Sequence, residues 1–269
     1  MLWSVNHVEA SNQYFLIPFG HQPKESPVDA SLCAPDGRHA GRYPLNPPVS
    51  HSLEVFCDFD GTITEVDATD AVLNQFARPQ WREWETLWQA DEISGRECLA
   101  QQLALIRATP RELLEFVNQL PLDPGILMLA HCCAERRVPL TVVSDGLNLI
   151  VKAVLNRLGL PELPFYANRV RWKKDGSLSL RFPYGAPNCK NGACKCRLVA
   201  RGGEDGIRTV YIGNGRSDFC VCRHVDTVYA KGDLIPWCQR EGIPFRAFQS
   251  LTDVSAHLFP TKGRSENFA

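Results

Sequence analysis

Short apolar runs alternate with longer amphipathic segments along most of this 269-residue chain. The first run spans Leu53 to Cys57, and later ones recur near 139–143, 208–212, 227–230 and 244–247. Apolar runs of this length are typical of buried strands, and their alternation with helical segments predicts a parallel sheet covered on both faces. We therefore expect a three-layer α/β fold.

Helical patterning dominates residues 67–120, between the first and second apolar runs. Helices are expected over Asp67–Phe76 and Pro79–Gln89, and capping-box patterns that begin at Ser94 and Thr109 predict two more. The second helix carries three tryptophans on one face, at i, i+3 and i+7: Trp81, Trp84 and Trp88. This spacing favours a hydrophobic core within the helical unit over contact with a substrate.

Two segments depart from the alternating pattern. Tyr166–Trp172 and Leu178–Phe182 are strand-like and flank Asp175-Gly176, which is a hairpin signal, so a small β-hairpin is expected there. Residues 1–52 contain scattered Pro, His, Ser and Gly without sustained periodicity. We expect residues 1–52 to be a poorly ordered extension.

Composition and charge narrow the class of partner. A net charge of −1 gives no field to attract nucleic acid or an anionic membrane, and no apolar run approaches the roughly 20 residues that span a bilayer. The N-terminus lacks the basic and apolar regions of a secretory signal. Eleven cysteines, several inside expected strands and helices, suit a reducing cytoplasm better than a disulfide framework. We expect a cytoplasmic monomer or homodimer that binds neither nucleic acid nor membrane.

Two acidic residues follow the first apolar run directly. Asp58 and Asp60 are spaced i and i+2, so both can face one ligand at the carboxyl end of the strand. A carboxylate can attack phosphorus, and a second carboxyl can protonate the leaving oxygen and later activate water. Two carboxylates repel a phosphate, so a divalent cation is expected beside them. Gly61 permits the tight turn that leaves the strand.

Polar residues follow two later apolar runs in the same way. The run over 138–143 ends in Ser144-Asp145-Gly146, before an expected helix over 147–158 whose first N–H groups favour an anion. The run that ends at Ile212 leads into a glycine-rich turn with Asn214 and Asp218. Both segments are therefore expected at the same edge of the sheet as Asp58.

Lys195 opens a further short helical segment. The three strand-end segments and this lysine resemble the four motifs of the haloacid dehalogenase-like (HAD) phosphatases, in the order that the family requires. The resemblance covers roughly residues 54–258. It implies a Rossmann-like core over 53–66 and 121–260, with a helical cap domain over 67–120 inserted after the first strand. It also implies a Mg²⁺-dependent phosphatase that forms an aspartyl-phosphate and acts on a small phosphomonoester. A mutase or phosphotransferase on the same scaffold would carry the same acids and stays an alternative.

The resemblance assigns roles to the matched residues. Asp58 is the nucleophile, Asp60 the general acid and base, and Ser144 and Lys195 hold phosphoryl oxygens, with Lys190 as the competitor of Lys195. The predicted substrate contacts are Gly61, Thr62, Asp145 and Gly146. The predicted metal ligands are Asp58, the main-chain carbonyl of Asp60, Asn214 and Asp218. The family usually has an acid at the position of Asn214, and an uncharged ligand there predicts weaker Mg²⁺ affinity. An alternative is therefore a catalytically impaired protein that only binds a phosphorylated metabolite.

The helical cap, the cysteine-rich segment before Lys195 and the run Gly213–Phe219 are similar to the branch that contains phosphoserine phosphatase. They are more similar to the methionine-salvage phosphatase that acts on 2-hydroxy-3-keto-5-methylthiopentenyl-1-phosphate. Phosphocholine and phosphoethanolamine phosphatases carry the same motifs. The motifs therefore do not distinguish which of these compounds is the substrate.

Three cysteines fall within eight residues, at Cys189, Cys194 and Cys196. Such a group could bind Zn²⁺, although its spacing is not that of a standard zinc knuckle and no partner histidine lies nearby. A redox-sensitive loop and a loop of reduced thiols are the other interpretations.

Overall fold

The computed structural model describes residues 53–173, 178–202 and 206–260. The expected extension over 1–52 and the expected hairpin turn at Asp175-Gly176 lie outside the described residues.

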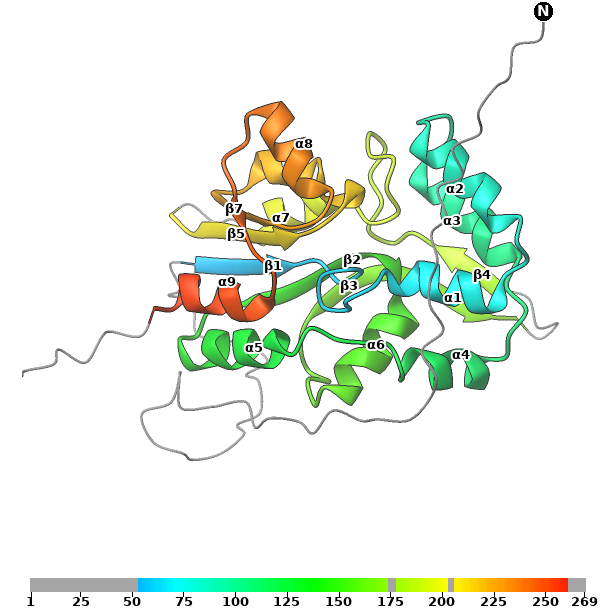
Figure 1. The fold of residues 1–269 in the computed structure, drawn as a ribbon, viewed down its shortest axis with the longest axis horizontal. Helices are drawn as coiled ribbons and strands as arrows, with labels where there is room; N and C mark the ends of the chain where they lie inside the picture. The colour runs from blue at the N-terminus through cyan, green and yellow to red at the C-terminus, as the bar shows by residue number, and fades with distance from the viewer. Residues whose placement is uncertain (1–52, 174–177, 203–205, 261–269) are drawn as a thin grey trace, which may run out of the picture.

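A seven-stranded sheet forms the middle layer, in the order β4-β3-β2-β1-β5-β6-β7 (Figure 1). Its strands are β1 (Leu53–Cys57), β2 (Leu140–Leu147), β3 (Phe165–Trp172), β4 (Leu178–Arg181), β5 (Arg208–Gly213), β6 (Thr227–Ala230) and β7 (Arg246–Ala247). Neighbouring strands pair in parallel, except that β3 and β4 are antiparallel. The α/β prediction is confirmed. The predicted hairpin is formed by β3 and β4, and it extends the main sheet because β3 also pairs with β2.

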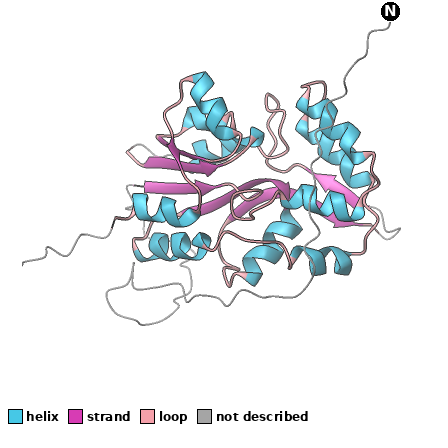
Figure 2. Ribbon diagram, viewed as in Figure 1, coloured by secondary structure: helices cyan, strands magenta, loops and turns pink. Residues whose placement is uncertain are grey.

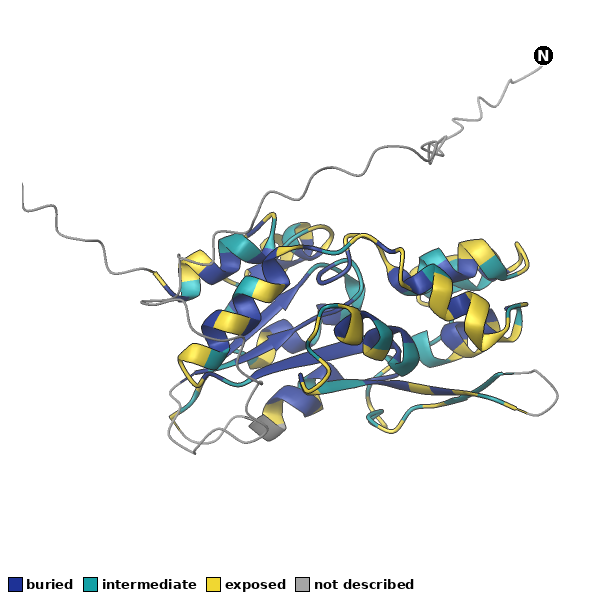
Figure 3. Cartoon of the chain, turned by 90° about the horizontal axis from the view of Figure 1, so that it is seen from below, coloured by how far each residue is buried: buried dark blue, intermediate teal, exposed yellow. Residues whose placement is uncertain are grey.

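Helices cover both faces of the sheet (Figure 2). They are α5 (Gly125–Glu135), α6 (Asn148–Arg157), α7 (Lys195–Gly202), α8 (Leu234–Glu241) and α9 (Leu251–Leu258). In Figure 1, α5, α6 and α9 lie below the sheet, and α7 and α8 lie above it. The central strands are therefore buried between layers, whereas the edge strands β4 and β7 are partly or fully exposed (Figure 3). Val55 and Cys57 of β1 are completely inaccessible. None of the helices in the described ranges has both the length and the apolar character needed to cross a bilayer.

Four helices follow β1, as the sequence predicts. They are α1 (Ala68–Phe76), α2 (Trp81–Gln89), α3 (Gly95–Ala104) and α4 (Pro110–Val117). Asp67 caps α1 by accepting a hydrogen bond from the Asp70 N–H at 2.8 Å, and Thr109 forms a capping box with Glu112. Trp81 is buried in the core, whereas Trp88 lines a pocket described below. The core interpretation of the tryptophan face therefore holds for Trp81 but not for Trp88.

Helices α5 and α9 pack unusually closely below the sheet, and Asp123 connects their starts. The buried carboxylate of Asp123 accepts hydrogen bonds from the Gly125 N–H at 2.8 Å and the Leu251 N–H at 2.9 Å. A Cβ atom at position 125 would overlap the backbone nitrogen of Thr252. Only glycine therefore fits at this helix contact.

Gly125→Ala should destabilise the protein by at least about 2 kcal/mol, because the two helix backbones must move apart to accommodate one methyl group. Urea unfolding followed by circular dichroism measures the change. Leu127→Ala is the control, because Leu127 lies on the same helix and is exposed, and its effect should stay within about 0.5 kcal/mol. Equal effects of the two substitutions would contradict the close contact.

Candidate active site

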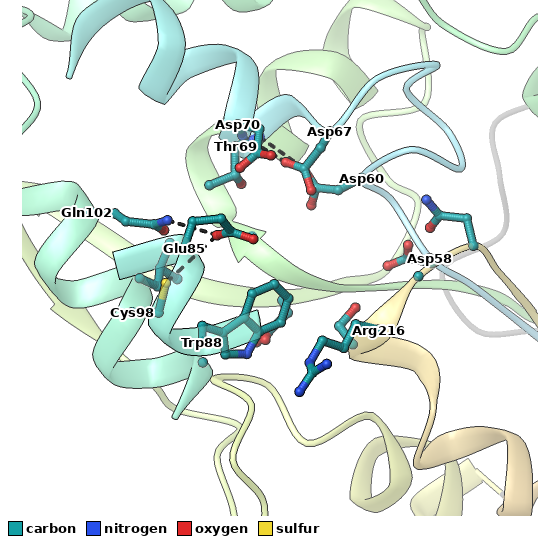
Figure 4. A pocket seen from close by; sticks show the side chains of 17 residues that line it. Asp58, Asp60, Asp67, Thr69, Asp70, Glu85, Trp88, Cys98, Gln102 and Arg216 are labelled. Carbon is teal, nitrogen blue, oxygen red and sulfur yellow. Dashed lines mark hydrogen bonds between the residues drawn. The ribbon is translucent and has the colours of Figure 1, made fainter. Parts of the chain in front are cut away.

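The carboxyl ends of β1, β2 and β5 meet at one edge of the sheet, and the predicted site residues follow them. A pocket of about 160 Å³ opens there (Figure 4). Asp58 and Asp60 line it from the segment after β1, Asp145 and Gly146 from β2, and Asn214 from the turn after β5. The structure thus brings together residues that are up to 156 positions apart, which is the separation of Asp58 and Asn214 (214 − 58).

A buried ion-pair cluster joins three of the predicted residues. Lys195 Nζ lies 2.6 Å from Asp58 Oδ1, 2.5 Å from Asp218 Oδ1 and 3.0 Å from Ser217 Oγ. Lys195 and Asp218 are fully buried, and Asp58 is 3% exposed. The competing lysine, Lys190, lies instead at the surface, 3.5 Å from Asp91. Of these two lysines, Lys195 is therefore the one that contacts Asp58.

Four donors hold Asp218. Its Oδ1 accepts from Lys195 and from the Tyr211 hydroxyl, each at 2.5 Å, and its Oδ2 accepts from the N–H groups of Asn214 and Gly215 at 2.9 and 3.1 Å. A carboxylate has about four acceptor positions, and these donors match that number, so the metal role of Asp218 stays a prediction. The geometry makes Asp218 the anchor of Lys195 and of the turn that carries Asn214.

Burial and charge act together on this cluster. Burial opposes the charge on Lys195, but the carboxylates of Asp218 and Asp58 outweigh it and raise the pKa of the lysine, so the ammonium group stays charged. Burial, together with Asp218, raises the pKa of Asp58 to about 8 against the opposing effect of Lys195. One ammonium thus does not compensate two buried carboxylates. A further cation beside Asp58 is needed to keep it an anion at neutral pH.

Asp60 is held in a different environment, at the mouth of the pocket. Its Oδ1 accepts from the N–H groups of Ala68 and Thr69 at the start of α1, at 3.1 and 3.2 Å. Its Oδ2 accepts from Ser144 Oγ at 3.0 Å. Burial and the charge of Asp67 raise the pKa of Asp60 to about 7. A carboxyl with this pKa can exchange a proton in both directions near neutral pH, as a general acid and base must.

The turn after β1 brings Asn214 beside Asp58. Gly61 has φ of +71°, and a Cβ atom there would overlap the side-chain amide of Asn214. The buried Thr62 hydroxyl donates to Asn214 Oδ1 at 3.1 Å and lies 3.5 Å from Asp58 Oδ2. Gly61 and Thr62 therefore position Asn214 and do not line the pocket themselves.

The sequence predicts ligands for two metal ions, Zn²⁺ at the cysteines and Mg²⁺ at the strand ends. In the part of the chain that the structure describes, no group of three or more His, Cys, Asp or Glu residues is arranged to hold a metal ion. The predicted zinc group at Cys189, Cys194 and Cys196 thus gains no support. Asp58 Oδ2 and Asn214 Oδ1 both lie near Thr62 Oγ1, and an all-oxygen set of this kind suits a hard divalent cation.

Three acids at the pocket mouth were not predicted. Asp67 and Asp70 come from the start of α1, and Glu85 comes from α2, where it accepts from Gln102 Nε2 at 3.0 Å (Figure 4). Burial and the charge of Glu85 raise the pKa of Asp70 to about 7. In the sequence, Asp67 and Asp70 are typical capping residues at the start of a helix, and Glu85 is an ordinary acid inside one. No local signal therefore marked them as pocket residues.

Arg216 connects the core to the helices over the pocket. It forms an ion pair of 2.8 Å with Asp91 and lies 5.4 Å from the ring centroid of Trp88. Asp145, which the sequence predicts as a substrate contact, accepts from the Ala193 N–H at 2.7 Å, and burial raises its pKa. Asp145 therefore also holds the loop before Lys195.

A family model described as haloacid dehalogenase-like hydrolase matches residues 55–223. The chain belongs to this family. The resemblance carried by the four motifs is thereby confirmed, and the matched range contains every catalytic and metal-binding residue that the sequence predicts.

Two curated relatives of this HAD hydrolase are named 2-hydroxy-3-keto-5-methylthiopentenyl-1-phosphate phosphatase. The one from Geobacillus kaustophilus is 30% identical and matches 77% of this chain and 95% of its own length. The one from Exiguobacterium sp. is also 30% identical and matches 77% of this chain and 97% of its own length.

Solved structures share the HAD fold of this chain. A phosphoserine phosphohydrolase-like protein from Francisella tularensis has a TM-score of 0.58 at 21% identity, and 77% of this chain and 99% of that chain are covered. A substrate-bound phosphoserine phosphatase has a TM-score of 0.60 at 17% identity, with 77% and 98% covered. At these identities the likeness shows the fold alone.

Tyr211→Phe should lower kcat of this HAD hydrolase about tenfold with little change in KM, because Asp218 loses one of its four donors and holds Lys195 less firmly. Steady-state hydrolysis of an aryl phosphate measures both constants. The matched control is Tyr229→Phe, since Tyr229 is a buried tyrosine on the neighbouring strand β6. If Tyr211→Phe leaves kcat unchanged while the thermal midpoint falls, the hydroxyl has only a structural role.

Proposed function

We propose that the chain is a Mg²⁺-dependent phosphomonoesterase that works through an aspartyl-phosphate on a small phosphorylated metabolite. One observation carries the proposal: two carboxyls that follow the central strand have different partners. Asp58 contacts the buried ammonium of Lys195, whereas Asp60 contacts the Ser144 hydroxyl and the N–H groups at the start of α1. With a divalent cation beside it as well, Asp58 would be the anion that a nucleophile must be, while Asp60, whose pKa is raised to about 7, can carry the proton of a general acid.

The chain offers oxygen ligands for Mg²⁺. Asp58, the main-chain carbonyl of Asp60 and the amide oxygen of Asn214 would hold the ion. Asp218, the fourth predicted ligand, would act through the backbone of Asn214, which it already anchors. When bound, Mg²⁺ would neutralise charge between Asp58 and the phosphoryl oxygens.

The residues of the chain divide the reaction between them. Asp58 attacks phosphorus in line, and Asp60 donates its proton to the leaving oxygen. Lys195 and Ser144 bind the equatorial oxygens, where charge is spread in the transition state, with N–H groups near Gly146 as further donors. Asp60 then accepts a proton from water as it hydrolyses the aspartyl-phosphate.

The substrate that the relatives suggest is 2-hydroxy-3-keto-5-methylthiopentenyl-1-phosphate. The relatives named for it match 95% and 97% of their own length with this chain, so the likeness spans nearly their whole length. Trp88 and Leu99 supply apolar surface at the pocket mouth for such a thioether chain.

The charge of the pocket mouth favours a second candidate, an amine-bearing phosphomonoester such as phosphoserine, phosphoethanolamine or phosphocholine. Asp67, Asp70 and Glu85 line the mouth, and Arg216, the one cation lining it in the described residues, is already paired with Asp91. The proposed phosphoryl chemistry uses none of these three acids. A leaving group with a positive charge would compensate them.

Asp58→Asn should abolish phosphate release from an aryl phosphate in the presence of Mg²⁺, because an amide cannot form the covalent intermediate. Asn214→Asp is the companion variant and should lower the Mg²⁺ concentration for half-maximal activity about tenfold, since the ligand gains a charge. Malachite-green detection of phosphate measures both effects. If the wild type and Asp58→Asn release phosphate equally, the proposed function is wrong.

The two substrate candidates differ in charge, which a matched pair of substrates tests. If the acids bind an amine, kcat/KM for phosphoethanolamine should exceed that for propyl phosphate at least tenfold, and Asp70→Asn should reduce this ratio. Thr86→Ala, on an exposed face of α2, is the control and should keep the ratio. A ratio near one, with faster turnover of the methylthiopentenyl compound, would leave only the first candidate.

A further inference from the structure

A second cavity, of about 660 Å³, lies beside the active-site pocket, and Trp88 and Arg216 line both. Four cysteines line this second cavity: Cys189, Cys194, Cys196 and Cys220. Cys194 is buried, and the other three are partly exposed. The proposed phosphatase chemistry uses none of these thiols. The cavity is therefore a separate feature of the molecule.

The thiols of this cavity contact one another across two segments of the chain. The Cys189 thiol interacts with those of Cys220 and Cys194, and the Cys220 thiol also interacts with that of Cys196. Contact with Cys220, together with burial, raises the pKa of Cys189, so this thiol is protonated at neutral pH. Protonated thiols react slowly, so any pairing needs prolonged exposure to an oxidant.

Cys189 belongs to a loop that the cap helices hold. The guanidinium of Arg96, at the start of α3, donates to the main-chain carbonyls of Cys189 at 2.6 Å and Asn191 at 2.8 Å, and also to that of Ala186. Lys190 pairs with Asp91, in the turn between α2 and α3. Movement of the cap therefore moves this loop with it.

Cys220 belongs to the core, two residues beyond Asp218. The same segment carries Ser217, whose hydroxyl contacts Lys195 at 3.0 Å. Asn191 Nδ2 donates to the Ser217 carbonyl at 3.0 Å, so the loop and the core already touch next to the two cysteines. Cys189 and Cys220 thus lie on two core segments that meet here, and the segment with Cys189 is the one that α3 and the turn before it hold.

We propose that this cavity is an oxidation site in which Cys189 and Cys220 form a disulfide that ties the loop held by the cap to the core. The oxidant is a small acidic disulfide such as oxidised glutathione, which the cavity can admit past the cationic side chains of Lys190 and Arg240.

The disulfide forms by thiol–disulfide exchange in two steps. The sulfur of one cysteine attacks the small disulfide, forms a mixed disulfide and releases one thiol, which takes up the cysteine proton. The second cysteine then attacks the protein sulfur of the mixed disulfide, forms the Cys189–Cys220 bond and releases the second thiol. Two electrons pass from the protein to the small disulfide. The cross-link restrains the opening of the cap, on which product release depends.

The test uses the full chain, incubated for hours with an excess of oxidised glutathione and compared with the same protein kept in dithiothreitol. Free thiols are blocked, and disulfides are mapped by peptide mass spectrometry. We expect a Cys189–Cys220 peptide, and a fall in kcat for an aryl phosphate of about fivefold that dithiothreitol reverses. Glu-C protease should also cut after Glu92, in the turn between α2 and α3, more slowly in the oxidised protein.

Cys189→Ser and Cys220→Ala should each lose the cross-link and the change in kcat, whereas Cys196→Ser is the matched control and should keep both. Thermal melts establish that each variant is folded. The proposal is overturned if other cysteines pair, if no pair forms, if the cross-link leaves both kcat and proteolysis unchanged, or if the purified protein carries stoichiometric zinc on these thiols. Mapping and proteolysis need no turnover, so a protein without phosphatase activity would count against the proposed function alone.

Discussion

One buried cation determines the arrangement of the site. Lys195 contacts Asp58 from the end of β1 and Asp218 from beyond β5, and it enters at the first residue of α7. Three segments that are distant in sequence therefore converge on one ammonium group. In water such pairs contribute little, but a fully buried pair cannot lose one partner without leaving an uncompensated charge. The cluster thus fixes where the nucleophile points, because any other position of Asp58 would separate it from its counterion.

With a divalent cation bound beside Asp58, the two ends of the pocket would have opposite electrostatic character. At the inner end Lys195, together with a bound divalent cation, would favour the phosphoryl group. At the outer end Asp67, Asp70 and Glu85 come from α1 and α2 and their caps. A phosphomonoester with a cationic tail would match both ends, whereas a neutral tail would rely on Trp88 and Leu99. Charge at the outer end is therefore what distinguishes the two groups of candidate substrates.

Local sequence was enough to predict the sheet, the four helices after β1 and the residues at strand ends. Asp58, Ser144 and Asn214 could be found because each follows an apolar run, and parallel strands bring such positions together. Tyr211 could not be found, since a tyrosine inside an apolar run is indistinguishable from a core residue until its hydroxyl has a partner. Asp218 was matched as a metal ligand, but sequence spacing does not reveal that four donors occupy its oxygens.

The burial of Lys195 also limits how this protein could lose its activity in evolution. Substitution of Lys195 would leave two carboxylates in the interior without a counterion, so the loss of catalysis would come with a loss of folded protein. Asp60 lies at the pocket mouth, and an amide there could still accept the N–H groups of Ala68 and Thr69. Inactive descendants that persist as folded proteins should therefore have changed Asp60 and kept Lys195, and a search for pseudoenzymes in this branch should begin at that position.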